Sequence, residues 1–557
     1  MFDNKFSIDY HKSMNITGKM SGIKRKLNAY ANKSKHYAKV FKIKCKQYHV
    51  LKYVIILFTI YILALMPLFR ANYNYKDDLG RTFVGYRFKD FGRYGSDMLS
   101  IGLWASRYLT DISPFPQILA AFIMALAGTM LIFIIRRELP NDDRRFHVRD
   151  IVATIPLALF PYFLECLCYK YDAPFMALSV FISIFPLLFK NRKRRQYVVI
   201  SALSMLLMCI TYQASSGVYP MLVLLIFAIM LLQKKKDVMK FLIWSVIPYV
   251  VALLFYEVFM VPKYNVYVTN EMFSLNKLLP GVINNFRTYL KIIKSNFSLV
   301  WLALIAAALI LCIIGLVTSS KLRWHQSLTI AIVLPAVMFL LCFGVYPALT
   351  KPLFAPRGML GFGIWITMIF ITACACCRWY FVPGVVCLAA SYSFFTFALS
   401  LGNILNNEQE YANFREYMII SDISQIEASS KQHNKVRKLK VAGSIGYAPS
   451  YRKYNSVKSA KIMTWMIPRV LKDDTSCWWY DHHLANYYGL RNINYCSECS
   501  MFKDNKKNSV VINSANGKLS KKDEKVMKEV HKKYKVRNSM YNDVYYNDKE
   551  IFVVLKQ

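Results

Sequence analysis

Long apolar runs recur along the chain, and short clusters of Lys and Arg separate them. A helix needs about 20 predominantly apolar residues to cross the hydrocarbon core of a bilayer. About eleven runs come close to this length, so the sequence predicts an α-helical polytopic membrane protein. The runs lie at 53–69, 117–135, 150–166, 173–189, 197–213, 217–232, 240–261, 297–318, 327–346, 357–377 and 380–402.

The chain is strongly basic. Its 557 residues include 72 Lys and Arg against 32 Asp and Glu, which gives a net charge of +40. Such an excess can indicate a nucleic-acid-binding protein, but here the cations lie in short loops and tails beside the apolar runs. Hydrophobic residues make up 55% and charged residues only 19%, below the quarter or so that is usual in soluble proteins. We therefore expect a membrane protein without a nucleic-acid partner.

The basic clusters also predict the orientation. Residues 1–52 are rich in Lys and Arg, with only Asp3 and Asp9 as acids, and are too long for the basic start of a signal peptide. We expect a cytoplasmic N-terminal segment and an uncleaved first span. Cytoplasmic loops are enriched in Lys and Arg. The loops that this orientation places inside carry cations at 136–137, 144–145, 192–195, 234–236, Lys321, Arg323 and Arg378.

Three regions follow from this topology. The basic segment 1–52 precedes a transmembrane domain at 53–402, which includes an outer loop at 70–115. An odd number of spans places residues 403–557 outside the cytoplasm. This tail is polar and rich in Lys, Asn and Tyr, and we expect it to form a small α/β domain over the outer membrane face. Its predicted elements are strands at 438–442, 509–512 and 551–555 and a helix at 519–534.

The outer loop at 70–115 carries the main candidate site. Asp77 and Asp78 follow the first span, and Arg81 and Arg93 lie further along the same loop. Neighbouring carboxylates raise one another's pKa, whereas nearby arginines lower it. One Asp could act as a general base at the membrane surface, and the arginines could contact phosphate or sugar. The alternatives are a solvated turn for the Asp pair and arginines that only extend to the interface.

Further polar residues lie near the outer ends of later spans. Glu165 is inside the outer end of the third span, and acids at membrane depth often have a function. Asp172 could bind sugar hydroxyls or assist the base, or it could cap the helix that begins just before Pro174. Arg357 could bind a lipid phosphate or anchor the tenth span. We interpret Tyr212 as an aromatic anchor at the membrane interface.

An acidic pair after the first helix, an amphipathic segment on the outer surface and an outer C-terminal domain resemble the GT-C class of membrane glycosyltransferases. More narrowly, the chain resembles the type II glucosyltransferase family of O-antigen serotype conversion. This resemblance covers the membrane region and is strongest at residues 70–175. The motifs that carry it are Asp77-Asp78-Leu79-Gly80-Arg81, Gly85-Tyr86, Gly92-Arg93-Tyr94 and Pro114–Pro116.

The resemblance implies a reaction, its partners and a location. The donor would be a polyprenyl-phosphate-linked hexose, with glucose as the sugar, and the acceptor a surface polysaccharide such as the O-antigen of lipopolysaccharide. The enzyme would work at the outer leaflet of the bacterial cytoplasmic (inner) membrane, with partners that synthesise and flip the lipid-linked sugar. For this reaction, the candidate base is Asp77 or Asp78, and the candidate substrate contacts are Arg81, Arg93, Asp172 and Arg357.

No cofactor is expected. The neighbours of the Asp pair are arginines, although such a pair can bind a divalent cation. Cys477, Cys496 and Cys499 indicate zinc only weakly, because a fourth ligand at a regular spacing is missing. In an oxidising outer compartment, a disulfide between two of these three cysteines is the better prediction.

Three other functions compete with this interpretation. A transporter or flippase of lipid-linked sugar usually has repeated halves and ionisable residues near mid-membrane, whereas this chain places its acids at the outer ends of spans. A polysaccharide O-acyltransferase would need a histidine base, and all nine His residues lie outside the predicted spans. A scaffold without activity would leave the dense acid–arginine loop at 70–95 without a role.

Overall fold

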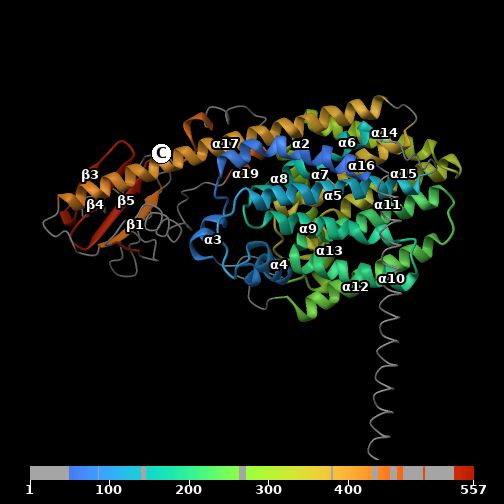
Figure 1. Ribbon diagram of the computed structural model, residues 1–557, viewed down its shortest axis with the longest axis horizontal. Helices are drawn as coiled ribbons and strands as arrows, with labels where there is room; N and C mark the ends of the chain where they lie inside the picture. The colour runs from blue at the N-terminus through green and yellow to red at the C-terminus, as the bar shows by residue number, and fades with distance from the viewer. Residues whose placement is uncertain are drawn as a thin grey trace, which may run out of the picture.

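The computed structural model describes residues 49–85, 87–139, 146–261, 271–377, 381–429, 437–443, 445–451, 461–467, 493–495 and 532–556. These residues form a body of packed helices and a smaller β-sheet, and one long helix connects the two (Figure 1).

The elements of the helical body are α2 (Val50–Ala71), α3 (Asp78–Val84), η1 (Lys89–Phe91), α4 (Tyr94–Trp104), α5 (Phe115–Glu138), α6 (Val148–Thr154), α7 (Pro156–Leu159), α8 (Pro161–Cys168), α9 (Ala173–Ile184), η2 (Phe185–Phe189), α10 (Arg194–Thr211), η3 (Gln213–Gly217), α11 (Val218–Leu232), α12 (Val238–Phe259), α13 (Leu275–Asn296), α14 (Leu299–Thr318), α15 (Trp324–Leu341), η4 (Tyr346–Ala348), η5 (Pro356–Gly358), α16 (Leu360–Cys376) and α17 (Phe381–Ala428).

The described helices confirm a membrane protein. Seven of them are long and apolar enough to cross a bilayer, namely α2, α5, α11 together with η3, α12, α14, α15 and α17. The run from α6 to α8 is a further candidate, and it is bent by 57° beside Pro161. The apolar helices α9 with η2 and α16 are shorter. Each predicted apolar run lies on a helix of the structure, while the count of about eleven spans remains a prediction.

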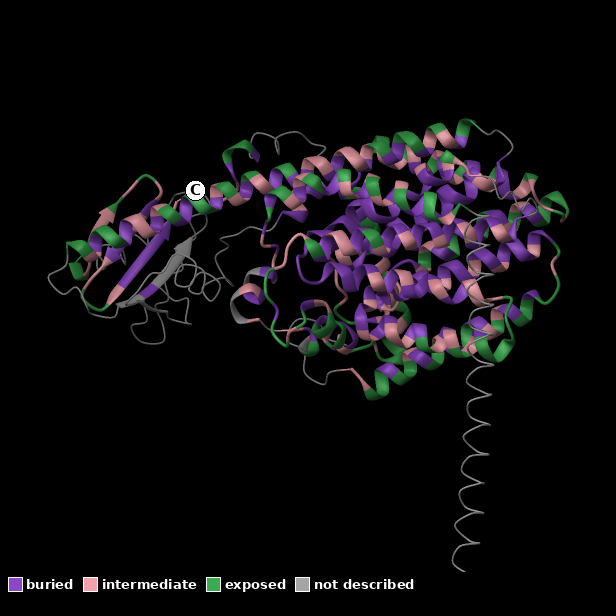
Figure 2. Cartoon of the chain, in the orientation of Figure 1, coloured by how far each residue is buried: buried purple, intermediate pink, exposed green. Residues whose placement is uncertain are grey.

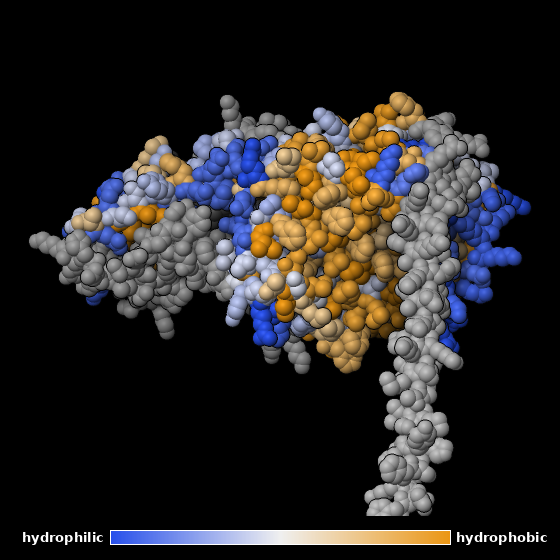
Figure 3. All heavy atoms as spheres, viewed as in Figure 1, coloured by the Kyte–Doolittle hydropathy of each residue, from blue (hydrophilic) through white to orange (hydrophobic). Residues whose placement is uncertain are grey.

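The helical body has a buried centre and an apolar outer surface. Almost every residue of α16 is buried (Figure 2), and α6, α8, α11 and α14 are among the helices that pack against it. The peripheral helices α12, α14 and α15 instead expose apolar side chains such as Leu254, Ile310 and Ile332. Figure 3 shows this apolar surface over the middle of the body, with polar residues towards both ends. This arrangement suits a protein whose periphery contacts lipid.

α2 and α17 lie side by side and run in the same direction (Figure 1). A Cβ on Gly402 of α17 would lie 2.4 Å from the backbone nitrogen of Leu68 in α2, so only glycine allows this close approach. Near the first residues of the two helices, Tyr53 of α2 donates a hydrogen bond to Asp150 at 3.1 Å, and Gly384 of α17 lies beside Arg149. Both helices therefore begin at one end of the body and reach the other.

The β-sheet lies at the far end of α17 and has the strand order β2-β1-β5-β4-β3. Strand β1 is parallel to β2 and β5, whereas β4 is antiparallel to β3 and β5. α17 continues past residue 402 and packs on this sheet, where Arg415 donates to the carbonyls of Tyr541 and Lys556. The elements of this region are β1 (Arg437–Gly443), α19 (Lys461–Met466), β2 (Ile493–Tyr495), β3 (Lys535–Asn538), β4 (Asn542–Tyr546) and β5 (Glu550–Leu555).

Part of the predicted tail can be compared with the structure. The predicted strands at 438–442 and 551–555 correspond to β1 and β5. The predicted strand at 509–512 and most of the predicted helix at 519–534 lie outside the described residues. The same is true of the N-terminal residues 1–48 and of the predicted disulfide among Cys477, Cys496 and Cys499.

Candidate functional site

The predicted outer loop folds into α3, η1 and α4, at the end of the helical body nearest the β-sheet (Figure 1). Gly85 ends α3 and Gly92 ends η1, and both have a left-handed backbone, with φ of 67° and 68°, which residues with a side chain rarely adopt. A Cβ on Gly95 would lie 2.8 Å from Ile210, so α4 packs closely on α10. The glycines of the sequence motifs therefore set the turns of this loop.

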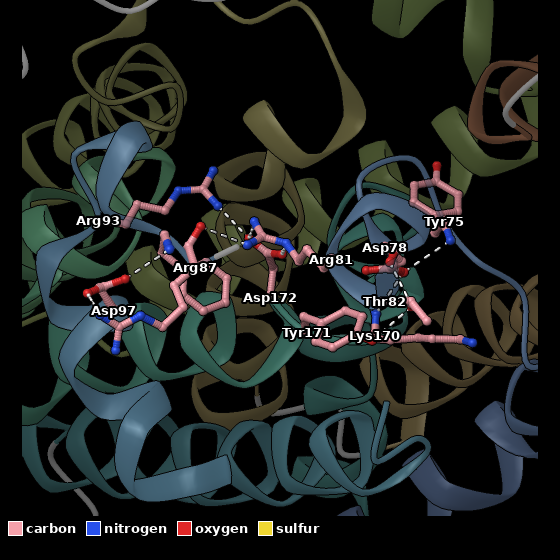
Figure 4. Close-up of polar contacts among 11 residues, drawn as sticks. Tyr75, Asp78, Arg81, Thr82, Arg87, Arg93, Asp97, Lys170, Tyr171 and Asp172 are labelled. Atoms are coloured by element: carbon pink, nitrogen blue, oxygen red, sulfur yellow. Dashed lines mark hydrogen bonds and ion pairs between the residues drawn. The ribbon is translucent and has the colours of Figure 1, made fainter. Parts of the chain in front are cut away.

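Asp78 lies at the start of α3 and is fully buried. Its Oδ2 accepts hydrogen bonds from the backbone N–H groups of Tyr75 and Lys170, both at 3.0 Å (Figure 4). Its Oδ1 is buried and has no hydrogen-bond partner among the described residues. Burial raises the pKa of Asp78 well above its usual value, although the two N–H donors act against this shift. Asp78 thus connects α3 to the segment before α9.

Asp172 binds two arginines from the outer loop. Its Oδ2 is 3.2 Å from Nε of Arg81, and its Oδ1 is 2.7 Å from Nη1 of Arg93 (Figure 4). Asp172 occupies the position before α9, but its side chain forms no cap hydrogen bond with that helix. The structure therefore joins three predicted site residues, and the carboxylate of Asp172 is directed to the arginines rather than to the helix.

Glu165 is the buried acid of a second cluster. It lies in α8, accepts a hydrogen bond from the hydroxyl of Tyr75 at 3.0 Å, and contacts the ammonium group of Lys76. It also accepts from the backbone nitrogen of Arg357 at 2.6 Å, and the guanidinium of Arg357 lies 3.5 Å away. The Tyr75 hydroxyl is also 2.5 Å from the carbonyl of Met466 in α19. Glu165 therefore contacts residues from two distant parts of the sequence, and Tyr75 connects them to α19.

Three of the four cations in these two clusters are partly exposed. The side chains of Arg93, Arg357 and Lys76 are 17%, 21% and 28% exposed, whereas that of Arg81 is 1% exposed. The Arg93 guanidinium lies 4.8 Å from the ring centre of Tyr212, and the Arg357 guanidinium lies 5.6 Å from that of Tyr169. Four cations thus share the two buried carboxylates of Asp172 and Glu165, which leaves an excess of positive charge.

Asp77 differs from its neighbour Asp78. It is only partly buried, and it interacts electrostatically with Arg357 and Tyr169. Asp77 therefore interacts with the partly exposed cation Arg357, whereas the carboxylate of Asp78 accepts from backbone N–H groups. The two adjacent acids, which the sequence did not distinguish, occupy different environments.

Several site residues could not be found from the sequence. Lys76 is separated from Glu165 by 89 positions and Lys170 from Asp111 by 59, yet both pairs are in contact. Burial acts to raise the pKa of Asp111, but hydrogen bonds from Ser113 and the charge of Lys170 lower it overall. The interpretation of Tyr212 as an interface anchor is wrong, because its ring is buried beneath Arg93. An aromatic residue after a span carries no signal that separates these two roles.

The described residues contain no group of three or more His, Cys, Asp or Glu side chains arranged to hold a metal ion. The cations in the two clusters form a site suited to an anionic ligand.

The comparison with known proteins agrees with the motifs in the outer loop. The family described as "Glucosyl transferase GtrII" matches residues 65–368, which is more than half of the chain. The chain belongs to this family. The match begins in α2 and ends in α16, and it includes the outer loop, Glu165, Asp172 and Arg357. The predicted resemblance to the type II glucosyltransferases of serotype conversion is therefore confirmed.

The chain is also similar to a bacteriophage protein. The chain is 26% identical over 433 residues to an uncharacterized 55.3 kDa protein in the gtrB 5′ region of Salmonella phage P22. The alignment covers 74% of this chain and 86% of the phage protein. No solved structure matches the chain.

Proposed function

We propose that this protein transfers a hexose, glucose, from a polyprenyl-phosphate-linked donor to a surface polysaccharide such as O-antigen, at the outer face of the bacterial cytoplasmic membrane. The observation that carries the proposal is the group of partly exposed cations, Lys76, Arg93 and Arg357, which pair with the buried carboxylates of Glu165 and Asp172. Asp77 interacts electrostatically with Arg357. Membership in a glucosyltransferase family supports the reaction class.

The cations suit the phosphate of such a donor. Arginine binds phosphate oxygens through two parallel N–H donors, and charge-assisted hydrogen bonds are stronger than neutral ones. The aromatic rings of Tyr169 and Tyr212 and the buried acids fix Arg357 and Arg93 in place. Fixed donors stabilise charge that develops in a transition state without reorganisation. Arg93 and Arg357 would therefore stabilise the phosphate as it leaves the anomeric carbon.

Asp77 is the better candidate for the general base. In the proposed step, the acceptor hydroxyl gives its proton to the Asp77 carboxylate while its oxygen bonds to the anomeric carbon. The bond between that carbon and the phosphate oxygen breaks, and its electron pair leaves with the lipid phosphate. Asp78 is less suited because it is fully buried and its raised pKa favours the protonated form. Its role would be to position the loop.

Two further predicted contacts take positioning roles in this proposal. Arg81 is almost completely buried, and its guanidinium is held by Asp172 and the carbonyl of Arg87. Asp172 in turn is occupied by Arg81 and Arg93. Both would act by positioning Arg93, whose partly exposed guanidinium would contact the substrate.

The proposed location follows from the two ends of the helical body. The basic segments 192–195 and 234–236 lie at the end where α2 begins, and such loops face the cytoplasm. The site and the β-sheet lie at the opposite end (Figure 1). The α2 N-terminus would then be cytoplasmic, and the sheet and the site would be extracytoplasmic. A GT-C-type architecture is part of the same proposal, as are partners that make and flip the donor.

The mass of the surface polysaccharide tests the function. Cells would carry the wild-type gene, the Asp77→Asn variant, or no gene. We expect one added hexose per repeat with the wild type, and none with Asp77→Asn or without the gene. An added acetyl group instead would identify an O-acyltransferase, and an unchanged mass in all three strains would favour a flippase of lipid-linked sugar.

A further inference from the structure

Helix α13 is unlike the other long helices of the body. It has 22 residues (LNKLLPGVINNFRTYLKIIKSN), which include four cations and no acid. It lies between the spanning helices α12 and α14 in sequence. Its neighbours are η4, which follows α15, and α19 of the C-terminal region. These neighbours place α13 at the same end of the body as the candidate site.

One face of α13 is fixed to the protein. The side-chain nitrogen of Asn285 donates to the carbonyls of Pro347 and Leu349, at 2.9 and 3.0 Å. The ring of Tyr289 stacks on that of Phe343, with centres 4.2 Å apart and planes at 4°. The helix is thus held rigidly against the segment that leads to η5.

The rest of the helix surface divides into an apolar flank and a cationic flank. Successive residues are rotated by about 100° around a helix, so Leu275, Leu279, Ile283 and Leu290 fall on one side of the buried face. All four are exposed, with Leu275 and Leu279 at 89% and 69%. Lys277, Arg287, Lys291 and Lys294 lie beyond them on the helix circumference and are also exposed.

The cationic flank is not neutralised by the protein. None of its four members forms an ion pair with another residue in the described ranges. An amphipathic helix with exposed leucines beside lysines and arginines fits the boundary between acyl chains and anionic headgroups. Basic residues near an anionic membrane surface each contribute about fivefold in affinity.

We propose that α13 lies in the plane of the membrane interface and binds anionic phospholipids of the outer leaflet. The apolar flank is inserted among the acyl chains, and Arg287, Lys291 and Lys294 bind the lipid phosphates. The inference rests on the outer location in the proposed function, but not on the reaction. Because α13 is fixed to the segment before Arg357, it sets the depth of the site relative to the lipid phosphates.

Nitroxide labels test the depth of the helix. Full-length protein would be labelled at Leu279→Cys on the apolar flank or at Asn284→Cys on the polar side and reconstituted into phosphatidylglycerol–phosphatidylcholine vesicles. We expect relaxation by oxygen to dominate at position 279 and relaxation by a water-soluble nickel complex to dominate at position 284. Protein without either added cysteine gives the background signal. Relaxation by nickel at both positions would overturn the proposal.

The lipid preference is measured separately. The triple variant Arg287→Gln/Lys291→Gln/Lys294→Gln would be compared with Lys532→Gln/Lys535→Gln/Lys549→Gln, which removes three exposed cations beside or within the β-sheet. Native mass spectrometry measures retained lipid after equilibration with equal amounts of phosphatidylglycerol and phosphatidylcholine. We expect the α13 variant to lose its preference for phosphatidylglycerol by about tenfold or more, and the control to keep it.

Three results would contradict this account of the lipid. These are an unchanged preference in the α13 variant, an equal loss in the β-sheet control, and displacement of phosphatidylglycerol by inorganic phosphate at the same concentration. The nitroxide and mass-spectrometry experiments both measure lipid contact rather than glycosyl transfer. Their failure is therefore distinguishable from failure of the proposed reaction.

Discussion

The two ends of the helical body use similar charged residues in different ways. At the end where α2 begins, Arg136 binds Asp150 through two nitrogens, at 2.5 and 2.7 Å. Beside it, Arg137 donates to the carbonyls of Leu187 and Leu188 in η2, at 2.9 and 3.3 Å. These guanidinium groups satisfy acceptors of the protein and hold the ends of helices together.

At the opposite end, Arg93 and Arg357 would retain donors for the proposed donor phosphate. The Arg93 side chain pairs with Asp172, and the Arg357 side chain pairs with Glu165 and interacts electrostatically with Asp77. Both are partly exposed and lie over aromatic rings. The comparison teaches that the number of donors left over, rather than the presence of a buried ion pair, separates a candidate site from a structural one.

The largest effect is expected from removing the proposed base. Asp77→Asn should lower hexose transfer by about 100-fold or more, as expected for loss of a general base, while the protein stays folded and inserted. The matching change at the other end, Asp150→Asn, should lower the midpoint of thermal unfolding, because it weakens the pairing of the buried Arg136. Transfer assays and thermal unfolding of both variants measure this. Normal transfer by Asp77→Asn together with loss of transfer in a stable Asp150→Asn would contradict this distinction between the two ends.

A smaller effect is expected from the arginines. Arg357→Ala should raise the KM for the lipid donor about tenfold, since a hydrogen bond to a charged group contributes about 1.5–3 kcal/mol, and should leave the KM for the acceptor nearly unchanged. Arg137→Ala should lower stability without changing either KM. Steady-state kinetics with varied donor and acceptor give these values. An unchanged donor KM in Arg357→Ala would reassign that arginine to anchoring the helix.

Asp78→Asn should behave differently from Asp77→Asn. Its folded-state pKa is raised, so the folded protein holds a proton that the unfolded chain releases, and wild-type stability should fall as pH rises above about 4. The asparagine cannot ionise and can still accept the two backbone hydrogen bonds. We expect hexose transfer within a few-fold of wild type and a midpoint of unfolding that depends less on pH. Thermal unfolding across a pH series measures this dependence. Loss of transfer as large as in Asp77→Asn would show that Asp78 is the base.

The smallest effect is expected at the contact with the C-terminal region. Tyr75→Phe removes the hydroxyl that reaches Glu165 and the carbonyl of Met466, and should cost about 1 kcal/mol of stability. Denaturant unfolding measures this value. A fall in transfer without a fall in stability would instead place Tyr75 in contact with the substrate.

Much of this architecture follows from the sequence. Apolar runs and basic loops predict the helices because membrane spans have a strong local signal, and the Asp77–Asp78 motif indicates the site. The environment of each residue is less predictable. The buried carboxylate of Asp78 accepts a hydrogen bond from the backbone of Lys170, which is far away in sequence. The pairing of Glu165 with Lys76 and Arg357 joins α8, the outer loop and η5. Such contacts depend on tertiary packing, which a single sequence does not display.

The most direct test of the central claim uses purified full-length protein in vesicles with a radiolabelled polyprenyl-phosphate-linked glucose and lipid-linked polysaccharide acceptor. Initial rates of label transfer would be compared for wild type, Asp77→Asn and Asp78→Asn at the same level of folded protein. The account predicts transfer by the wild type, about 100-fold less or lower with Asp77→Asn, and near wild-type transfer with Asp78→Asn. Normal transfer by Asp77→Asn would contradict it.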